Sequence, residues 1–241
     1  MNFLKRLPYI LFPARCCVCD KVIMPGEDIC AACDELTLHY PVKGDCCRIC
    51  GIEQTKCTCG KRLLYSKIAF PFFYENDVKH ALHRFKFRGR PELAVPYAKR
   101  MFISLAERQI SGGIDVITFI PMRKKAKFDR GYNQAELLAN EIGRLSGIPV
   151  MSLLCKKQDT AKQHSLGARR RTGNVLGIFE PLPGRLEEIK GKNILVVDDI
   201  VTTGSTLNEA AKTLLIFGAE RIYASAAAQR KRVQSAQKKP G

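Results

Sequence analysis

The chain has 241 residues, of which 46% are hydrophobic, and it carries a net charge of +17. This length can hold one domain with a hydrophobic core and a smaller module. Internal repeats and low-complexity tracts are absent from the sequence. The excess charge lies beyond residue 65, where 31 Lys and Arg accompany 16 Asp and Glu, and it favours a polyanionic partner such as nucleic acid or a pyrophosphorylated sugar.

Residues 1–13 are apolar but are interrupted by Lys5, Arg6 and Pro8, and they lack a small-residue cleavage site. The segment is too short and too broken for a signal peptide or a membrane span. We therefore expect a cytoplasmic protein. In that compartment disulfides are disfavoured, and clustered cysteines more often bind metal.

Ten of the eleven cysteines lie before Lys61, which marks residues 1–62 as a separate module. Two residues between cysteines let a tight turn point both sulfurs at one tetrahedral ion, and a second such turn closes the site to water. The module has few large apolar side chains, so metal binding would supply its folding free energy. We predict a double zinc ribbon with two structural Zn²⁺ ions, whose ligands are Cys16, Cys19, Cys30 and Cys33 for the first and Cys47, Cys50, Cys57 and Cys59 for the second.

The choice of ligands leaves alternatives open. Cys17 and Cys46 adjoin predicted ligands and could replace Cys16 or Cys47, and cross-bracing of the pairs would use the same eight ligands. Redox-active cysteines or disulfides are less favoured, because thioredoxin-like chemistry needs a strand–helix setting. Cys155, in an apolar run, is interpreted as a buried structural thiol.

Residues 63–228 alternate strands and helices, which predicts an α/β domain with a parallel sheet and right-handed crossovers. An edge strand is expected at 64–74, because Pro71 cannot donate to a ladder. Residues 229–241 are basic and are predicted to form a disordered tail. The elements expected in between are a short helix capped by Asn76 or Asp77, a helix from Pro91 to about Ile110, a buried strand at 115–121, a basic turn at 122–127, an amphipathic helix at 129–145, strands at 150–155 and 221–228, and a short extended piece at 175–179.

The segment 156–171 is longer than most connections, so it is interpreted as a functional loop. It mixes cations with amide and hydroxyl donors, including Gln163 and Arg171. Such a loop suits a lid that closes over charged oxygens and excludes water. A plain solvent-exposed loop is the alternative.

The most informative segment is 194–206, where four apolar residues precede Asp198 and Asp199, a hydroxyl-rich turn follows, and a helix begins that stops before Gly218. A helix N-terminus and hydroxyl donors favour a phosphate group. Adjacent carboxylates would repel a phosphate unless a neutral or cationic group lies between them, and a ribose diol can donate hydrogen bonds to both carboxylates. The segment therefore predicts a ribose-phosphate site, with a receiver-like strand tip as the alternative.

This pattern resembles the phosphoribosyl-pyrophosphate (PRPP) signature of type I phosphoribosyltransferases. The resemblance implies that Asp198 and Asp199 contact the ribose hydroxyls and that Mg²⁺ bridges the pyrophosphate. Arg123 with Lys124 or Lys125 would meet the pyrophosphate, together with Gln163 and Arg171 in the loop. The residues implied for the 5-phosphate are Thr202, Thr203, Gly204, Ser205 and Thr206.

Nearly the full length of the chain resembles the ComF family of natural-competence proteins, a double zinc ribbon fused to a phosphoribosyltransferase-like domain. The family implies a role in moving single-stranded DNA into the cytoplasm, beside a ComFA-like DNA helicase. The doubled cysteines at 16–17 and 46–47 depart from its pattern. The matching segments are Phe12-Pro13 before Cys16, Cys47-Arg48-Ile49-Cys50-Gly51, Phe85-Lys86-Phe87-Arg88-Gly89, Arg130-Gly131-Tyr132-Asn133-Gln134-Ala135, the loop residues Gln163, Leu166, Arg171 and Asn174, and the segment 197–204.

Two classes of function stay open at this point. As an enzyme, the protein would transfer a phosphoribosyl group, with Asp198 and Asp199 supporting positive charge at the anomeric carbon. As a binding protein, it would use the same pocket as a sensor or phosphate cradle while basic loops track single-stranded DNA. Phe85 and Phe87 lie among cations and could stack on bases, although core packing is expected for at least one of them. No segment indicates an acceptor nucleophile.

Overall fold

The computed structural model describes residues 13–38, 47, 50, 57, 63–110, 112–157 and 177–230. The predictions for Cys46, Cys59, Gln163 and Arg171 and for the tail beyond residue 230 lie outside these residues. Within the described residues, no helix is both long and apolar enough to cross a bilayer.

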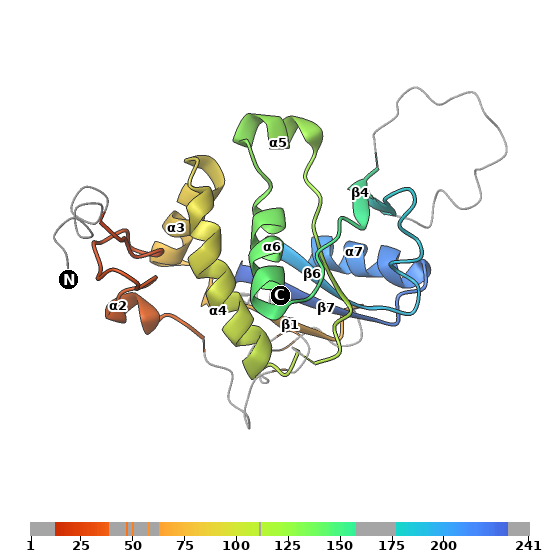
Figure 1. The fold of residues 1–241 in the computed structure, drawn as a ribbon, viewed down its shortest axis with the longest axis horizontal. Helices are drawn as coiled ribbons and strands as arrows, with labels where there is room; N and C mark the ends of the chain where they lie inside the picture. Colours follow the sequence, from red (N-terminus) through yellow and green to blue (C-terminus); the bar gives the residue numbers. More distant parts are fainter. Residues whose placement is uncertain are drawn as a thin grey trace, which may run out of the picture.

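A parallel sheet forms the centre of the domain (Figure 1). Its strands lie in the order β1-β7-β6-β3, with β2 continuing the β1 side along β7, and every pair is parallel. This confirms the predicted sheet, with the broken edge strand around Pro71. The strands are β1 Lys67–Ala69, β2 Phe72–Phe73, β3 Val116–Phe119, β6 Asn193–Val201 and β7 Arg221–Gln229.

Side chains alternate across the sheet and create two cores. Leu195 and Val197 belong to one core, with helices α3 (Asn76–Phe87), α4 (Ala94–Glu107) and α6 (Gln134–Ser146). Ile194 and Val196 belong to the other, with α7 (Ser205–Ile216). In Figure 1, α4 and α6 cross in front of the sheet and α7 lies behind it.

Three predicted elements differ from the structure. The basic turn at 122–127 is largely a short helix, α5 (Lys124–Arg130), which stands clear of the sheet in Figure 1. The helix expected at 129–145 begins only at Gln134, because Gly131 adopts a φ of 80° that ends α5 and the Asn133 side chain caps α6 by accepting from the Ala135 N–H.

The strand expected at 150–155 joins the main sheet only through a single bridge between Val150 and Ile117. Regular pairing begins later, where β4 (Leu154–Lys156) runs antiparallel to β5 (Phe179–Pro181). Leu154 and Phe179 of this ribbon bury their side chains in the core under α7. This ribbon brackets the predicted loop at 156–171, of which residues 158–171 lie outside the described part of the chain.

The remaining short elements are α2 (Ala31–Asp34), in the cysteine-rich segment, and the 3-10 helix η4 (Pro91–Leu93), which leads into α4 at the predicted Pro91 start. Helix α3 places Val78, Ala81, Leu82 and Phe85 on one buried face, as a helical period requires. That face packs in the same core as Cys16 and Cys17. The first cysteines are thus built into the domain's main core.

Candidate functional site

Asp198 and Asp199 lie near the end of β6, which extends beyond its neighbour β3. Strand β6 pairs with β7 through Val201, but it pairs with β3 only up to Val197. The two acidic residues therefore lie on the strand just past the end of its neighbour. Their carboxylates fix the local backbone, because Asp198 Oδ1 accepts from the Asp199 N–H at 2.8 Å and Asp199 Oδ1 accepts from the Ile200 N–H at 2.7 Å.

The edge left open beyond β3 forms a cavity of about 340 Å³. Both aspartates line it, and so does Thr206 in the first turn of α7. Four cationic side chains outnumber the two carboxylates in the lining, which gives the cavity a net positive charge. These cations are Lys86, Arg123, Arg130 and Lys156.

Charge repulsion within the acidic pair is partly compensated. Burial and the neighbouring carboxylate of Asp199 raise the pKa of Asp198 well above its usual value, while Lys86 opposes the shift. Lys86 Nζ lies 2.9 Å from Asp199 Oδ2. On the other side, burial and Arg123 lower the pKa of Lys156, and the charge of Asp198 opposes this. Lys86 thus acts on both aspartates, and Lys156 also interacts with Asp198.

The hydroxyl-rich turn lies at the N-terminus of α7. Gly204 has a φ of 79°, a left-handed conformation that favours glycine, and it directly precedes the helix. Thr203 Oγ1 and Ser205 Oγ lie 2.8 Å apart, and Thr203 Oγ1 also accepts from the Ser205 N–H. Thr202, Thr203 and Ser205 are exposed. The turn thus offers hydroxyls and helix N–H groups to solvent beside the cavity.

The basic residues predicted for the pyrophosphate divide into two groups. Arg123 lines the cavity, whereas Lys125 is exposed on α5 and does not contribute to the lining. Lys124 begins α5 directly after Arg123.

Four lining residues were missed as ligands of the pocket: Lys86, Arg130, Asn133 and Lys156. Three of them lie in segments already singled out, the 85–89 and 130–135 motifs. Lys156 begins the basic loop. The signal was present, but only the fold shows which members of each motif turn inward.

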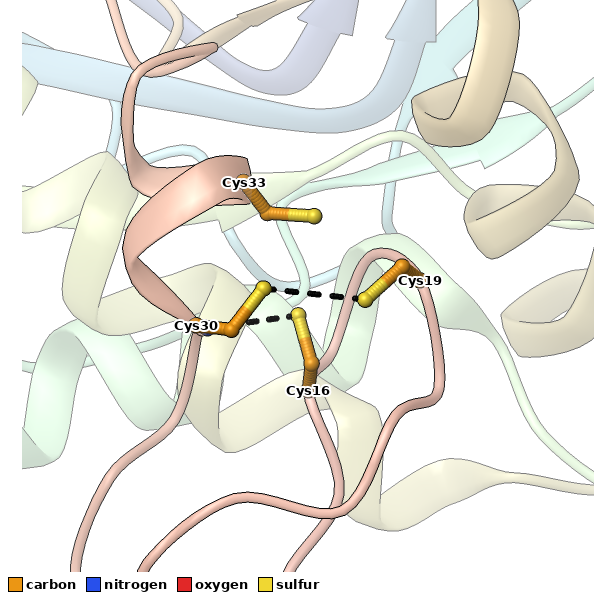
Figure 2. A group of neighbouring side chains, drawn as sticks. All are labelled: Cys16, Cys19, Cys30 and Cys33. Atoms are coloured by element: carbon orange, nitrogen blue, oxygen red, sulfur yellow. Dashed lines mark hydrogen bonds between the residues drawn. The ribbon is translucent and has the colours of Figure 1, made fainter.

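The four cysteine sulfurs predicted for the first zinc site converge (Figure 2), and all lie within 4.8 Å of one another. One turn supplies Cys16 and Cys19, and α2 with its preceding residue supplies Cys33 and Cys30. The sulfurs of Cys19 and Cys30 are 3.7 Å apart, far from the ~2.05 Å of a disulfide. Sulfurs bound at about 2.3 Å to one tetrahedral zinc ion would be about 3.8 Å apart, so the arrangement fits zinc.

The structure also separates Cys16 from Cys17. Burial raises the pKa of Cys16, but N–H groups of Cys30, Cys19 and Val18 outweigh it and lower the value to about 7, which favours a thiolate ligand. Cys17 points into the core with no exposed surface, and burial raises its pKa to about 12. Of the two alternatives, the geometry brings Cys16 into the cluster.

The second cysteine cluster is described through Cys47, Cys50 and Cys57, whose sulfurs also lie within 4.8 Å of one another. The sulfurs of Cys50 and Cys57 are 3.5 Å apart. Arg108, at the end of α4, donates to the carbonyl of Cys47 and to that of Ile68 in β1. Three convergent thiols again fit a zinc site.

Comparison with known proteins agrees with this geometry. The family described as "Phosphoribosyl transferase domain" matches residues 130–239. Competence protein ComFC of Bacillus subtilis is 31% identical over 207 residues, which cover 80% of each chain. DNA utilization protein YhgH of Escherichia coli K12 is 28% identical over 87% of this chain and 94% of its own. Competence protein F of Haemophilus influenzae is 27% identical over 88% and 95%.

A solved structure, purine phosphoribosyltransferase from Pyrococcus horikoshii Ot3, aligns with 58% of this chain and 79% of its own at 18% identity and a TM-score of 0.34. The parallel sheet, the acidic pair at its open edge and the family match define a phosphoribosyltransferase-like domain that carries an N-terminal cysteine-cluster region. The identity with ComFC extends across both parts. The chain therefore belongs to the ComF family of competence proteins.

Proposed function

We propose that this ComF-like competence protein binds PRPP with Mg²⁺ in the cavity at the end of β6 and handles single-stranded DNA in the cytoplasm during transformation. One observation carries the proposal. Two adjacent carboxylates lie in a cavity whose lining also contains four cations. A ligand that combines hydroxyls with several phosphates is complementary to such a mixed lining.

Different residues of the chain would bind different parts of PRPP. Asp198 and Asp199 accept hydrogen bonds from the ribose hydroxyls. The turn at 202–206 and the first N–H groups of α7 hold the 5-phosphate. The pyrophosphate is held by Arg123, by Lys124, and by Gln163 and Arg171 from the lid. Bound Mg²⁺ would neutralise pyrophosphate charge and orient it.

Calorimetric titration with PRPP and Mg²⁺ tests the binding claim. We expect saturable heats for the native protein, and at least a tenfold loss of affinity in Asp199→Asn, equivalent to about 1.4 kcal/mol. Glu220→Gln is the matched control, because Glu220 is exposed beside the start of β7, at the opposite end of the sheet. Absent heats in folded native protein would refute PRPP binding.

The DNA claim is supported by an aromatic and basic surface next to the pocket. Phe85 is buried in the core, as expected for one of the two phenylalanines, whereas Phe87 is 55% exposed and Arg130 lies 4.8 Å from its ring centroid. Phe128 on α5 is 89% exposed. Exposed rings among cations are typical of surfaces on which single-stranded bases stack.

Binding to labelled single-stranded DNA should weaken steeply with salt, because phosphate contacts release counterions. The double variant Lys124→Glu and Lys125→Glu should reduce affinity further, and Phe87→Ala should reduce it with little change in the salt slope. Salt-insensitive binding, or none, would contradict this role. A ComFA-like helicase would be sought by co-purification once DNA binding is established.

The two cysteine clusters are proposed to hold one structural Zn²⁺ each, with Cys59 as the fourth ligand of the second. Metal analysis of reduced, carefully prepared protein should return two ions per chain. Cys57→Ser should return one, because the first cluster keeps its four sulfurs. A value near zero in native protein would remove the zinc proposal.

An active phosphoribosyltransferase without a DNA role is the second candidate, and the match to the phosphoribosyl transferase family favours it. Such an enzyme releases pyrophosphate from PRPP in the presence of an acceptor. Pyrophosphate release across a panel of purine and pyrimidine bases separates the two functions. Stoichiometric binding without release would leave PRPP as a bound ligand.

A further inference from the structure

Lys86, which lies outside the ribose-phosphate signature, forms an ion pair with the acidic pair. Lys86 Nζ lies 2.9 Å from Asp199 Oδ2, and the two side chains are only 26% and 14% exposed. Lys86 belongs to α3, on the face of the sheet that also carries the first cysteine cluster. The ion pair therefore joins two segments that lie more than 100 residues apart in the chain, α3 and β6.

The last turn of α3 is anchored in several places, so this lysine is not a mobile surface side chain. The Tyr132 hydroxyl donates to the carbonyl of Phe85, and Gln134 Nε2 donates to that of Lys86 at 3.3 Å. Arg84 Nη2 donates to the carbonyl of Val18 at 2.6 Å. The 85–89 and 130–135 motifs thus meet each other, and one result is a fixed origin for the Lys86 side chain.

The charges around Asp199 make the pair more than a surface salt bridge. Exposed ion pairs contribute little, but a half-buried lysine beside two adjacent carboxylates relieves a repulsion that water screens poorly. Lys156 lies near Asp198 from the other face and lines the same cavity. Lys86 and Lys156 thus both interact with the acidic pair within this cavity.

We propose that Lys86 is the resident counter-cation of this cavity: it pairs with Asp199 before a ligand enters, and it donates to the pyrophosphate oxygens of the ligand once the ribose hydroxyls take over the carboxylate. The inference rests on the proposed ribose-phosphate function and assigns a binding residue to that site. It makes ligand entry an exchange of partners in which no carboxylate is left uncompensated. A purely structural ion pair would not affect anion affinity in this way.

The test uses the full-length protein and two probes, PRPP with Mg²⁺ and inorganic pyrophosphate with Mg²⁺, titrated by calorimetry. Lys86→Met should lower the affinity for both at least tenfold, and Lys86→Arg should restore it to within about threefold of the native value, because a guanidinium also binds pyrophosphate. Lys86→Met should also need more Mg²⁺ for half-maximal binding. Lys79→Met is the matched control, since it removes one exposed charge from the same helix.

A variant pair guards against loss of folding. In Asp199→Asn the ion pair with Lys86 is already lost, so adding Lys86→Met there should cost less thermal stability than it does in native protein, yet still lower pyrophosphate affinity. If Lys86→Met and Lys79→Met bind pyrophosphate with equal affinity, the inference is overturned, regardless of the affinity for PRPP.

The two proposals fail in different ways. If native protein binds pyrophosphate through Lys86 but not PRPP, the PRPP function fails and this inference stands. If PRPP binds native and Lys86→Met protein equally, the function stands and the inference fails. If neither probe binds the folded native protein, both fail.

Discussion

The first cysteine cluster and the acidic pocket lie on two sides of α3 and differ in how they treat charge. At the cluster, four thiols, two of them buried and two partly buried, lie within 4.8 Å of one another. The neighbouring backbone accepts hydrogen bonds from Arg84, at the Val18 carbonyl, and from the Tyr97 hydroxyl, at the Cys17 carbonyl. At the pocket, two carboxylates share a cavity and the pKa of Asp198 is raised. The first arrangement would stabilise the fold with the proposed zinc ion bound, whereas the repulsion in the second opposes folding.

The second cysteine cluster sharpens this contrast. Among the described residues its apolar surroundings are small, with Leu63 packed against Cys47 and Cys50, and Arg108 ties it to β1. The first cluster instead shares the main core with α3, α4 and α6. We therefore expect loss of the first cluster to reach the pocket through α3 and loss of the second to remain local.

The largest expected effect is on stability when the first cluster loses a ligand. Cys33→Ser should lower the free energy of unfolding by on the order of 5 kcal/mol, because metal binding and core packing are lost together. Cys57→Ser should cost less, on the order of 2 kcal/mol. Urea unfolding followed by circular dichroism measures both, since the chain has no tryptophan. Equal losses would erase the distinction between the clusters.

Replacing Arg108 or Arg84 should have smaller effects on stability, and the two effects should differ. Arg108→Met leaves the buried carbonyls of Cys47 and Ile68 without this donor and should cost about 2 kcal/mol, with pyrophosphate affinity unchanged. Arg84→Met removes one hydrogen bond, to Val18, and should cost about 1 kcal/mol.

Pyrophosphate affinity should rank the two variants the other way round, with the larger loss in Arg84→Met. Arg84 lies two residues before Lys86, so Arg84→Met should loosen the last turn of α3 and weaken pyrophosphate binding about threefold, or ~0.7 kcal/mol. Calorimetry on both variants, with zinc content checked in each, makes the comparison. If Arg108→Met weakened pyrophosphate binding as much as Arg84→Met does, the claim that the first cluster affects the pocket through α3 would be refuted.

Sequence reasoning succeeded where one local pattern carried the information. The apolar run before Asp198, the turn after it and the helical run that stops before Gly218 are contiguous, so strand and helix were predicted together, and β6 and α7 confirm those two elements. The spacing of Cys16, Cys19, Cys30 and Cys33 likewise predicted a cluster whose geometry is present. Both patterns are short-range.

Contacts between distant segments were not predictable in this way. Lys86 was interpreted as one cation among aromatic residues, because its ion pair with Asp199 exists only after α3 packs over the sheet. The same holds for Tyr132 and Gln134, whose partners are backbone carbonyls of α3. The helix start at 129 was wrong for a local reason, since a glycine within a helical period can be tolerated, and here Gly131 ends one helix instead.

The effect expected at the pocket has the opposite sign from that at the clusters. Because the pKa of Asp198 is raised in the folded protein, the protonated carboxyl favours folding and the ionised one opposes it. This contribution is fully present below the ordinary value of 3.8 and is lost as pH rises through the raised value. Asp198→Asn removes the titration, so the variant should be more stable than native protein, by on the order of 1 kcal/mol at pH 8, with a smaller advantage at pH 5.

Asp199→Asn is the matched control for that measurement, because the neighbouring residue forms the ion pair with Lys86. Its replacement removes a favourable pair together with the repulsion, so it should not gain stability as pH rises in the way that Asp198→Asn does. Thermal unfolding of both variants and native protein between pH 5 and 8 gives the comparison. If Asp198→Asn is destabilised at pH 8, the acidic pair does not oppose folding, and the contrast between a stabilising cluster and a costly pocket is lost.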